Sequence, residues 1–214
     1  MTTLGNDRGP IAGLIPGALR LAAGVLAALQ IGLAPAQAET NIGIAEKVVR
    51  NVYGDNLLQR MQAGTSLVAN QRVRTGEQSA AGLVFLDDTR LSIGPASEVR
   101  LDEFVYSRQR SAAKGTLNVV KGLLRFASSK GRVDIRLKTK IATIGVRGTV
   151  FDVLANTRET EVAVHQGAVE VESGSGSRLV RAGEVLRISA DGRPQYGIWI
   201  RKTCFCSNSA KGRY

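Results

Sequence analysis

From Ser66 onward the chain reads as short apolar runs separated by pairs of turn-forming residues. These pairs recur along the chain as Thr75-Gly76, Gly94-Pro95, Lys114-Gly115, Lys130-Gly131 and Asp191-Gly192. No stretch after Gly64 carries the apolar period of an amphipathic helix, whereas alternation typical of strands is common. The pattern predicts an all-β fold of short antiparallel strands, arranged as a curved β-sandwich or a short solenoid-like module.

Two parts of the chain share one order of residues, which predicts an internal duplication. Ser92-Ile93-Gly94 and Ser97-Glu98-Val99 align with Thr143-Ile144-Gly145 and Gly148-Thr149-Val150 at a constant offset, and Leu117 to Phe126 is echoed by Val162 to Val171. Glycine is the residue that tolerates positive φ or a close backbone contact. Five glycines in these stretches are therefore predicted to be structural turn positions: Gly94, Gly122, Gly145, Gly148 and Gly167.

The first 38 residues read as a secretory signal peptide. Arg8 and Arg20 precede an apolar run from Leu21 to Leu33, and Ala36-Gln37-Ala38 has the small-residue pattern of a cleavage site. The rival reading is a membrane anchor, but the run is shorter than the roughly 20 residues that span a bilayer. We expect cleavage after Ala38, a periplasmic or secreted protein, and no stable transmembrane segment after cleavage.

The remaining chain divides by pattern into three regions. Residues 39–64 form a leader or first-strand region, in which Lys47 to Tyr53 suits a helix face and a short strand equally well. Residues 65–190 form the all-β domain, and residues 191–214 a C-terminal strand with a flexible tail.

The chain carries a formal net charge of +11, which favours anionic partners without specifying a fold. Export argues against nucleic acid, and the basic stretches lack the interleaved aromatic residues that stack on bases. The expected partner is therefore an envelope protein or an anionic envelope polymer, while the oligomeric state stays open.

The motifs resemble those of the FecR-type periplasmic domain family from about Val48 to Ile188. The matching parts, in chain order, are Thr75-Gly76, Leu86 to Leu91 leading into Ile93 to Ser97, Lys121-Gly122, Val146 to Thr149 with Phe151, Gln166-Gly167 before Val169 to Val171, and Ala182 to Glu184. The resemblance implies an exported all-β module that works by binding. In the best-known members this module receives a signal from an outer-membrane transporter and passes it to a sigma-factor-binding segment. Here a signal peptide stands where such members have an anti-sigma domain and a membrane span, so we expect a stand-alone exported member.

Four basic residues are candidates for contacting the partner. Arg147 lies between Gly145 and Gly148, where its guanidinium could present planar donors to a carboxylate or phosphate, or fold back onto carbonyl groups of adjacent turns. Alternation from Val133 to Lys140 places Asp134, Arg136, Lys138 and Lys140 on one face, opposite Val133, Ile135 and Leu137. This basic stripe predicts an anion-binding surface, although such residues also favour solubility and prevent pairing at sheet edges.

No grouping of residues predicts catalysis, a metal site or a cofactor. His165 shares a face with Glu161 by alternation, and no nucleophile accompanies it. Cys204 and Cys206 are two residues apart, at or beyond the reach of a disulfide on an extended strand, so a bent tail or a second chain would be needed. The expected function is that of a non-enzymatic binding module, acting as a sensor or scaffold component of the envelope. The alternative is a glycan hydrolase that recruits acids such as Asp134 or Asp152.

Overall fold

The computed structural model describes residues 41–107, 112–128 and 132–198, which lie in the second of two compact units, 39–214. Cys204 and Cys206 lie outside the described residues. Within those ranges every regular element is a strand, so no helix there could span a membrane. The all-β prediction is confirmed, and the ambiguous stretch near Lys47 is β-structure rather than helix.

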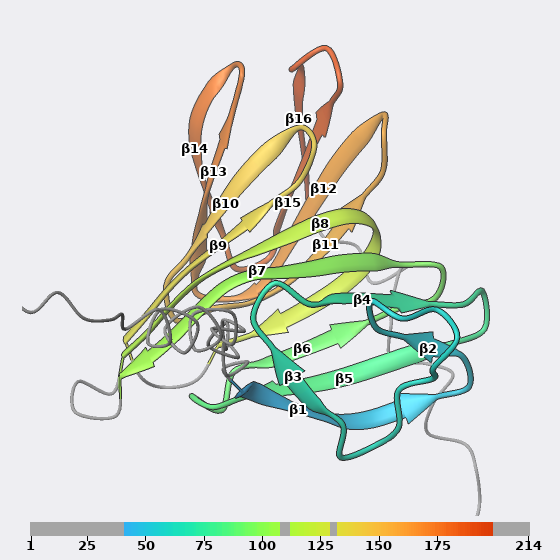
Figure 1. Cartoon of the computed structure of the whole chain (residues 1–214). Helices are drawn as coiled ribbons and strands as arrows, with labels where there is room; N and C mark the ends of the chain where they lie inside the picture. The colour runs from blue at the N-terminus through green and yellow to red at the C-terminus, as the bar shows by residue number, and fades with distance from the viewer. Residues whose placement is uncertain (1–40, 108–111, 129–131, 199–214) are drawn as a thin grey trace, which may run out of the picture. The chain divides into compact units, whose positions relative to one another are not determined.

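The strands form two sheets that share one strand. Sheet A has the order β3-β1-β5-β6-β8-β11-β12-β15-β16 and sheet B the order β2-β4-β7-β8-β9-β10-β13-β14 (Figure 1). The strands of sheet A other than β8 are β1 (Asn41–Val49), β3 (Ser66–Val68), β5 (Ala80–Phe85), β6 (Arg90–Ile93), β11 (Val150–Ala155), β12 (Glu159–Gln166), β15 (Glu184–Ser189) and β16 (Pro194–Ile198). The strands of sheet B other than β8 are β2 (Val52–Tyr53), β4 (Arg72–Thr75), β7 (Glu98–Ser107), β9 (Arg132–Lys138), β10 (Ala142–Val146), β13 (Ala168–Ser173) and β14 (Gly176–Arg181).

The shared strand β8 (Ala112–Ala127) passes from one sheet to the other at Gly122. Its first part pairs with β7 and β9 in sheet B, and its last residues pair with β6 and β11 in sheet A. The pairing of β8 with β9 is parallel, whereas the other strand pairs of the described chain are antiparallel. The network is therefore mixed and does not close on itself within the described residues, which modifies the expectation of purely antiparallel pairing.

The two sheets enclose one hydrophobic core. Alternate residues of most strands face it, for example Phe126, Phe151 and Val153 from sheet A and Ile144 and Val171 from sheet B. These side chains are at most 1% exposed. Alternation along each strand thus decides which residues are left for the outer faces, where binding can occur.

The predicted duplication is visible in the strand registers, with one correction. Val99 pairs with Val119 in β7–β8, as Phe151 pairs with Val164 in β11–β12. Val99 therefore corresponds to Phe151 rather than to Val150, so the sequence alignment is wrong by one residue after the turn. The first copy is the β7–β8 hairpin in sheet B, and the second copy is the β11–β12 hairpin in sheet A. The chain therefore passes from one sheet to the other between the two hairpins.

Matching hydrogen bonds hold the two copies. The Ser97 amide donates to Thr75 Oγ1 (3.0 Å) while the Thr75 amide donates to the Ser97 carbonyl (3.0 Å). In the second copy the Thr149 amide donates to Ser128 Oγ (2.8 Å) and the Ser128 amide to the Thr149 carbonyl (3.0 Å). In both copies a hydroxyl residue at the end of one strand thus forms hydrogen bonds with the residue that immediately precedes another strand.

Three of the five predicted turn glycines take positive φ: Gly122 at 111°, Gly148 at 68° and Gly167 at 77°. Gly122 and Gly167 occupy equivalent crossings between the sheets, which explains their matching places in the sequence. Gly94 and Gly145 do not have positive φ. Gly145 lies inside β10 rather than in the turn, so its conformational role is corrected.

Replacing Gly148 by valine should destabilise the protein by about 1 to 3 kcal/mol, because a β-branched residue is strained at positive φ. An added Cβ would meet no atom within 4 Å, so the loss comes from the backbone alone. Thermal melting measures it, with Gly148→Asn as the control that tolerates this φ better. Equal melting midpoints for the valine variant and the wild type would contradict this account of the turn.

Candidate binding trough on sheet B

The outer face of sheet B has a hollow of about 530 Å³ over β9, β10, β13 and β14. We call it the trough; its lining residues are Asp134, Arg136, Thr143, Gly145, Val146, Arg147, Ala168, Glu170, Glu172 and Leu179. The strand register explains the hollow, because Gly145 pairs with Arg136 on one side and Glu170 on the other. Because Gly145 has no side chain, the outer surface of the sheet is hollow in the middle of this row.

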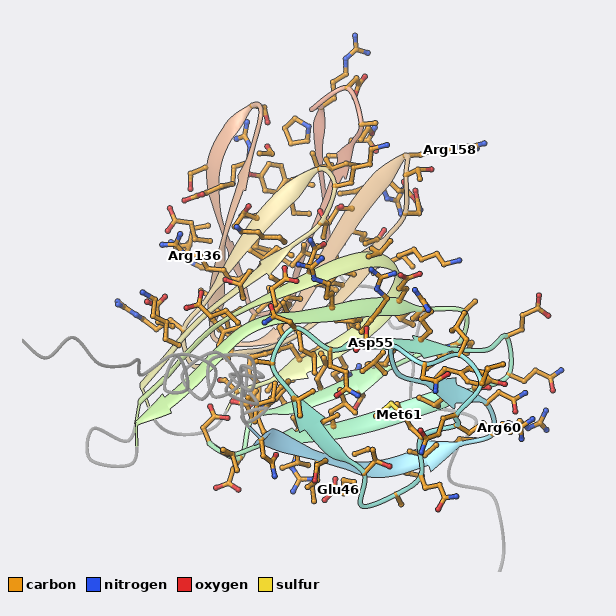
Figure 2. The ribbon with its side chains drawn as sticks, viewed as in Figure 1. Glu46, Asp55, Arg60, Met61, Arg136 and Arg158 are labelled. Atoms are coloured by element: carbon orange, nitrogen blue, oxygen red, sulfur yellow. The ribbon has the colours of Figure 1, made fainter. Side chains whose placement is uncertain are left out.

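The next row of the sheet repeats the arrangement. Thr143 pairs with Lys138 on β9 and with Glu172 on β13. The trough therefore has a basic wall on β9, an acidic wall on β13, and a floor of small residues on β10. All four charged wall residues are exposed, and Arg136 extends outward from the strands (Figure 2).

No ion pair between the walls neutralises their charges among the described residues. Two strand spacings separate β9 from β13, or about 9.6 Å. Within the described part of the chain, no ion pair joins Arg136 or Lys138 to Glu170 or Glu172. Glu170 instead accepts a hydrogen bond from the Ser177 hydroxyl on β14 (2.6 Å). Both walls thus present charge to solvent and to an incoming ligand.

The four predicted partner residues are only partly brought together. Arg136 and Arg147 line the trough, and Lys138 continues its basic wall along β9. Lys140 lies beyond the end of β9; it lines one hollow with Ile141, Thr157 and Gly192, and another with Thr143 and Glu172, which also line the trough. The stripe is also not at a sheet edge, since β9 pairs with both β8 and β10.

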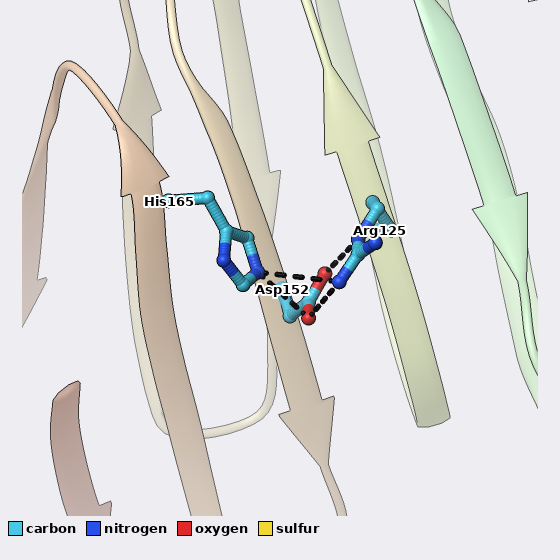
Figure 3. A network of polar contacts seen from close by, with 3 residues as sticks. All are labelled: Arg125, Asp152 and His165. Atoms are coloured by element: carbon cyan, nitrogen blue, oxygen red, sulfur yellow. Dashed lines mark hydrogen bonds and ion pairs between the residues drawn. The ribbon is translucent and has the colours of Figure 1, made fainter. Parts of the chain in front are cut away.

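A second polar cluster lies on the outer face of sheet A. The sequence pattern did not predict it. Arg125 on β8 binds Asp152 on β11 through two hydrogen bonds, from Nε to Oδ1 (2.6 Å) and from Nη2 to Oδ2 (2.8 Å) (Figure 3). Nε2 of His165 on β12 lies 2.9 Å from Asp152 Oδ2 and 3.3 Å from Arg125 Nη2. Asp152 is only 7% exposed.

A β-bulge positions His165 for this cluster. Val150 pairs with Gln166, while Phe151 pairs with Val164, so His165 is the additional residue between them. The equivalent bulge in the first copy leaves Val120 between partners Val119 and Lys121. Only the second copy therefore places a polar side chain at this point, next to Asp152.

Further along the same face, Arg187 on β15 contacts two acids of β12. Its Nε donates to Glu161 (2.9 Å) and lies 3.6 Å from Glu159. The hydrogen bond and the negative charge of Glu161 raise the pKa of Arg187. Arg187 therefore remains a cation throughout the pH range of a cell.

The described residues do not assemble a hydrolytic site from the acids suggested by the sequence. Asp134 is on β9 of sheet B and Asp152 on β11 of sheet A, and Asp152 is held by Arg125. No group of three potential metal ligands occurs among the described residues. The trough does contain Asp134, Glu170 and Glu172, but Arg136 lies two residues from Asp134 on β9 and opposite Glu170 across the floor. This arrangement suits recognition of a charged ligand.

Comparison with known proteins gives the class of this β-module. Residues 71–170 match the family described as FecR protein, so this part of the chain belongs to the FecR family. The family is one of regulatory or sensor domains and is in general non-enzymatic. No curated protein matches the sequence.

Two crystal structures of a candidate anti-sigma factor from Parabacteroides distasonis ATCC 8503, at 2.50 and 1.65 Å, are similar to this chain. Both have a TM-score of 0.49, with sequence identities of 17% and 16%. Each alignment covers 59% of this chain and 59% of the other. The chain therefore spans about three fifths of the length of these proteins.

Proposed function

We propose that this chain is a regulatory binding module of the cell envelope that recognises a protein partner through the trough on sheet B. Membership of the FecR family supports a regulatory or sensor role. The signal-peptide pattern of residues 1–38 supports action outside the cytoplasm. The observation that carries the proposal is the trough itself, in which Arg136 and Arg147 lie in one hollow with the exposed acids Glu170 and Glu172.

The charge of the trough favours a protein over an anionic polymer. A polyanion would meet Arg136 and Lys138 favourably but would be repelled by Glu170 and Glu172 a short distance away. A protein surface can supply both signs of charge. The net positive charge of the chain would still speed the approach of an acidic protein surface.

Replacing Arg136 and Lys138 together by glutamine should weaken capture of the partner from an envelope extract and flatten its salt dependence. Exposed charges attract over roughly 8 Å at physiological ionic strength, so removing them removes the screened part of the attraction. Because both side chains point outward, the melting midpoint should stay nearly constant. The measurement is retention of envelope protein on the immobilised chain, residues 39–214, at low and high salt.

Two controls make this test specific. Lys47→Gln removes an exposed charge on β1 of sheet A, which does not line the trough, and should leave capture unchanged. Changing Arg60 and Arg158, which are exposed on other parts of the domain, to glutamine matches the charge lost and should also have little effect (Figure 2). Equal losses in the matched control would show that net charge, and not the trough, holds the partner. Capture of a polysaccharide instead of a protein would reject the proposed class of partner.

Arg147→Lys addresses the end of the trough. Lysine keeps the charge but lacks the planar fork that binds a carboxylate through two donors. If Arg147 contacts the partner in that way, this variant should lose affinity while its melting midpoint stays unchanged. Unchanged capture would restrict the contact to the wall formed by β9.

A further inference from the structure

The two walls of the trough carry opposite charges at the same spacing. Arg136 and Lys138 are two residues apart on β9, and Glu170 and Glu172 are two residues apart on β13. Charges of one sign therefore recur about every 6.8 Å along each wall. The registers place Arg136 opposite Glu170 and Lys138 opposite Glu172, across Gly145 and Thr143.

An extended polypeptide has the same repeat. Its successive side chains point to opposite sides, and those on one side recur about every 6.8 Å. A segment lying along β10 can thus turn one side toward β9 and the other toward β13. Alternating acidic and basic residues would then place every acid against the basic wall and every base against the acidic wall.

We propose that the trough binds an extended polypeptide segment in which acidic and basic side chains alternate. Its acids contact Arg136 and Lys138, and its bases contact Glu170 and Glu172. This inference rests on the proposed function and specifies the kind of protein segment that the trough recognises. It limits the recognised length as well, because Asp134 reverses the charge of the β9 wall beside Arg147, where the trough ends.

The floor of the trough is suited to such a segment. An added Cβ at Gly145 would lie 3.7 Å from the Glu170 carbonyl oxygen and 3.9 Å from Glu170 Cβ, both ordinary contacts. Gly145 has no positive φ, so the fold itself does not require glycine there. The missing side chain instead leaves room over β10 for a ligand.

The first test compares two synthetic eight-residue peptides of identical composition and net charge. One alternates, as four Glu-Lys repeats, and the other has four glutamates followed by four lysines. Fluorescence anisotropy with residues 39–214 should show the alternating peptide binding about fivefold tighter or more, because only it can satisfy both walls at once. Equal affinities would overturn the inference.

The second test changes the specificity of the walls. Replacing Glu170 and Glu172 by lysine makes both walls basic, so the alternating peptide should bind several-fold more weakly and a peptide of four Glu-Thr repeats several-fold more tightly. Glu46→Lys with Glu77→Lys gives the same change in net charge at exposed positions on other strands and turns. The same change in peptide preference in that control would overturn the inference, since it would show that net charge alone causes the effect.

A third variant, Gly145→Gln, fills the floor with a polar side chain and should reduce binding of the alternating peptide without lowering the melting midpoint. Retained affinity in this folded variant would place the peptide elsewhere.

The outcomes separate the two proposals. Loss of pattern selectivity with continued capture of an envelope protein rejects the alternating segment alone, whereas failure to capture any protein rejects the proposed function.

Discussion

Replacing Gly122 by alanine should destabilise the protein by about 3 kcal/mol or more, because a methyl group there adds a backbone clash to the strain of a positive φ. Gly122 has φ of 111° at the point where β8 leaves sheet B and enters sheet A. An added Cβ would lie 2.5 Å from the backbone Cα of Ser97, a contact that a side-chain rotation cannot relieve. In a domain of this size the melting midpoint should fall by roughly 6 to 12 °C.

A second glycine separates the two causes of this loss. Gly176 has nearly the same φ, 107°, but an added Cβ there would meet no atom within 4 Å. Gly176→Ala should therefore show the backbone strain alone, about 1 to 2 kcal/mol. Similar melting midpoints for the two variants would mean that Ser97 moves aside freely, and that the crossing between the sheets is not a close contact.

The sequence predicts the class of fold because strand periodicity and turn chemistry are local. It does not predict which hairpin belongs to which sheet, since inward and outward residues alternate identically in both. The one-residue error in the duplication has a similar origin. Ser97 and Gly148 both follow a turn, but only the hydrogen bonds show that Ser97 is equivalent to Thr149.

The trough was partly predictable for the same reason. Alternation places Arg136 and Lys138 on an outer face, as the structure shows, but the acidic wall requires the pairing of β10 with β13. These strands are separated in the chain by β11 and β12, which lie in the other sheet. Sequence reasoning therefore found one wall and missed the other.

Arg125 was missed because its importance depends on strand order. Alternation already places His165 and Asp152 on outer faces of their strands. Their meeting requires β11 to lie between β8 and β12, and the bulge at His165 to direct its ring toward Asp152. The usable signal in the sequence was an arginine among the apolar residues Leu123 to Phe126, at a position that cannot face the core.

Asp152→Ala should cost about 3 kcal/mol of stability, much more than an exposed ion pair contributes. The Asp152 side chain is 10% exposed and accepts both hydrogen bonds from Arg125, whose side chain is 23% exposed. Its removal leaves a largely buried guanidinium without this counter-charge. Chemical denaturation of the variant and the wild type measures the loss.

A double-mutant cycle that combines Asp152→Ala with Arg125→Met isolates the interaction between the two side chains. If Arg125 and Asp152 act as a pair, Arg125→Met should destabilise the wild type clearly and the Asp152→Ala variant much less, because the counter-charge is already gone. The methionine stem also packs on neighbouring strands, so the double variant should regain part of the stability that the single change loses. Additive losses, or a loss near 0.5 kcal/mol for Asp152→Ala, would show that water replaces the carboxylate and that the cluster is an ordinary surface contact.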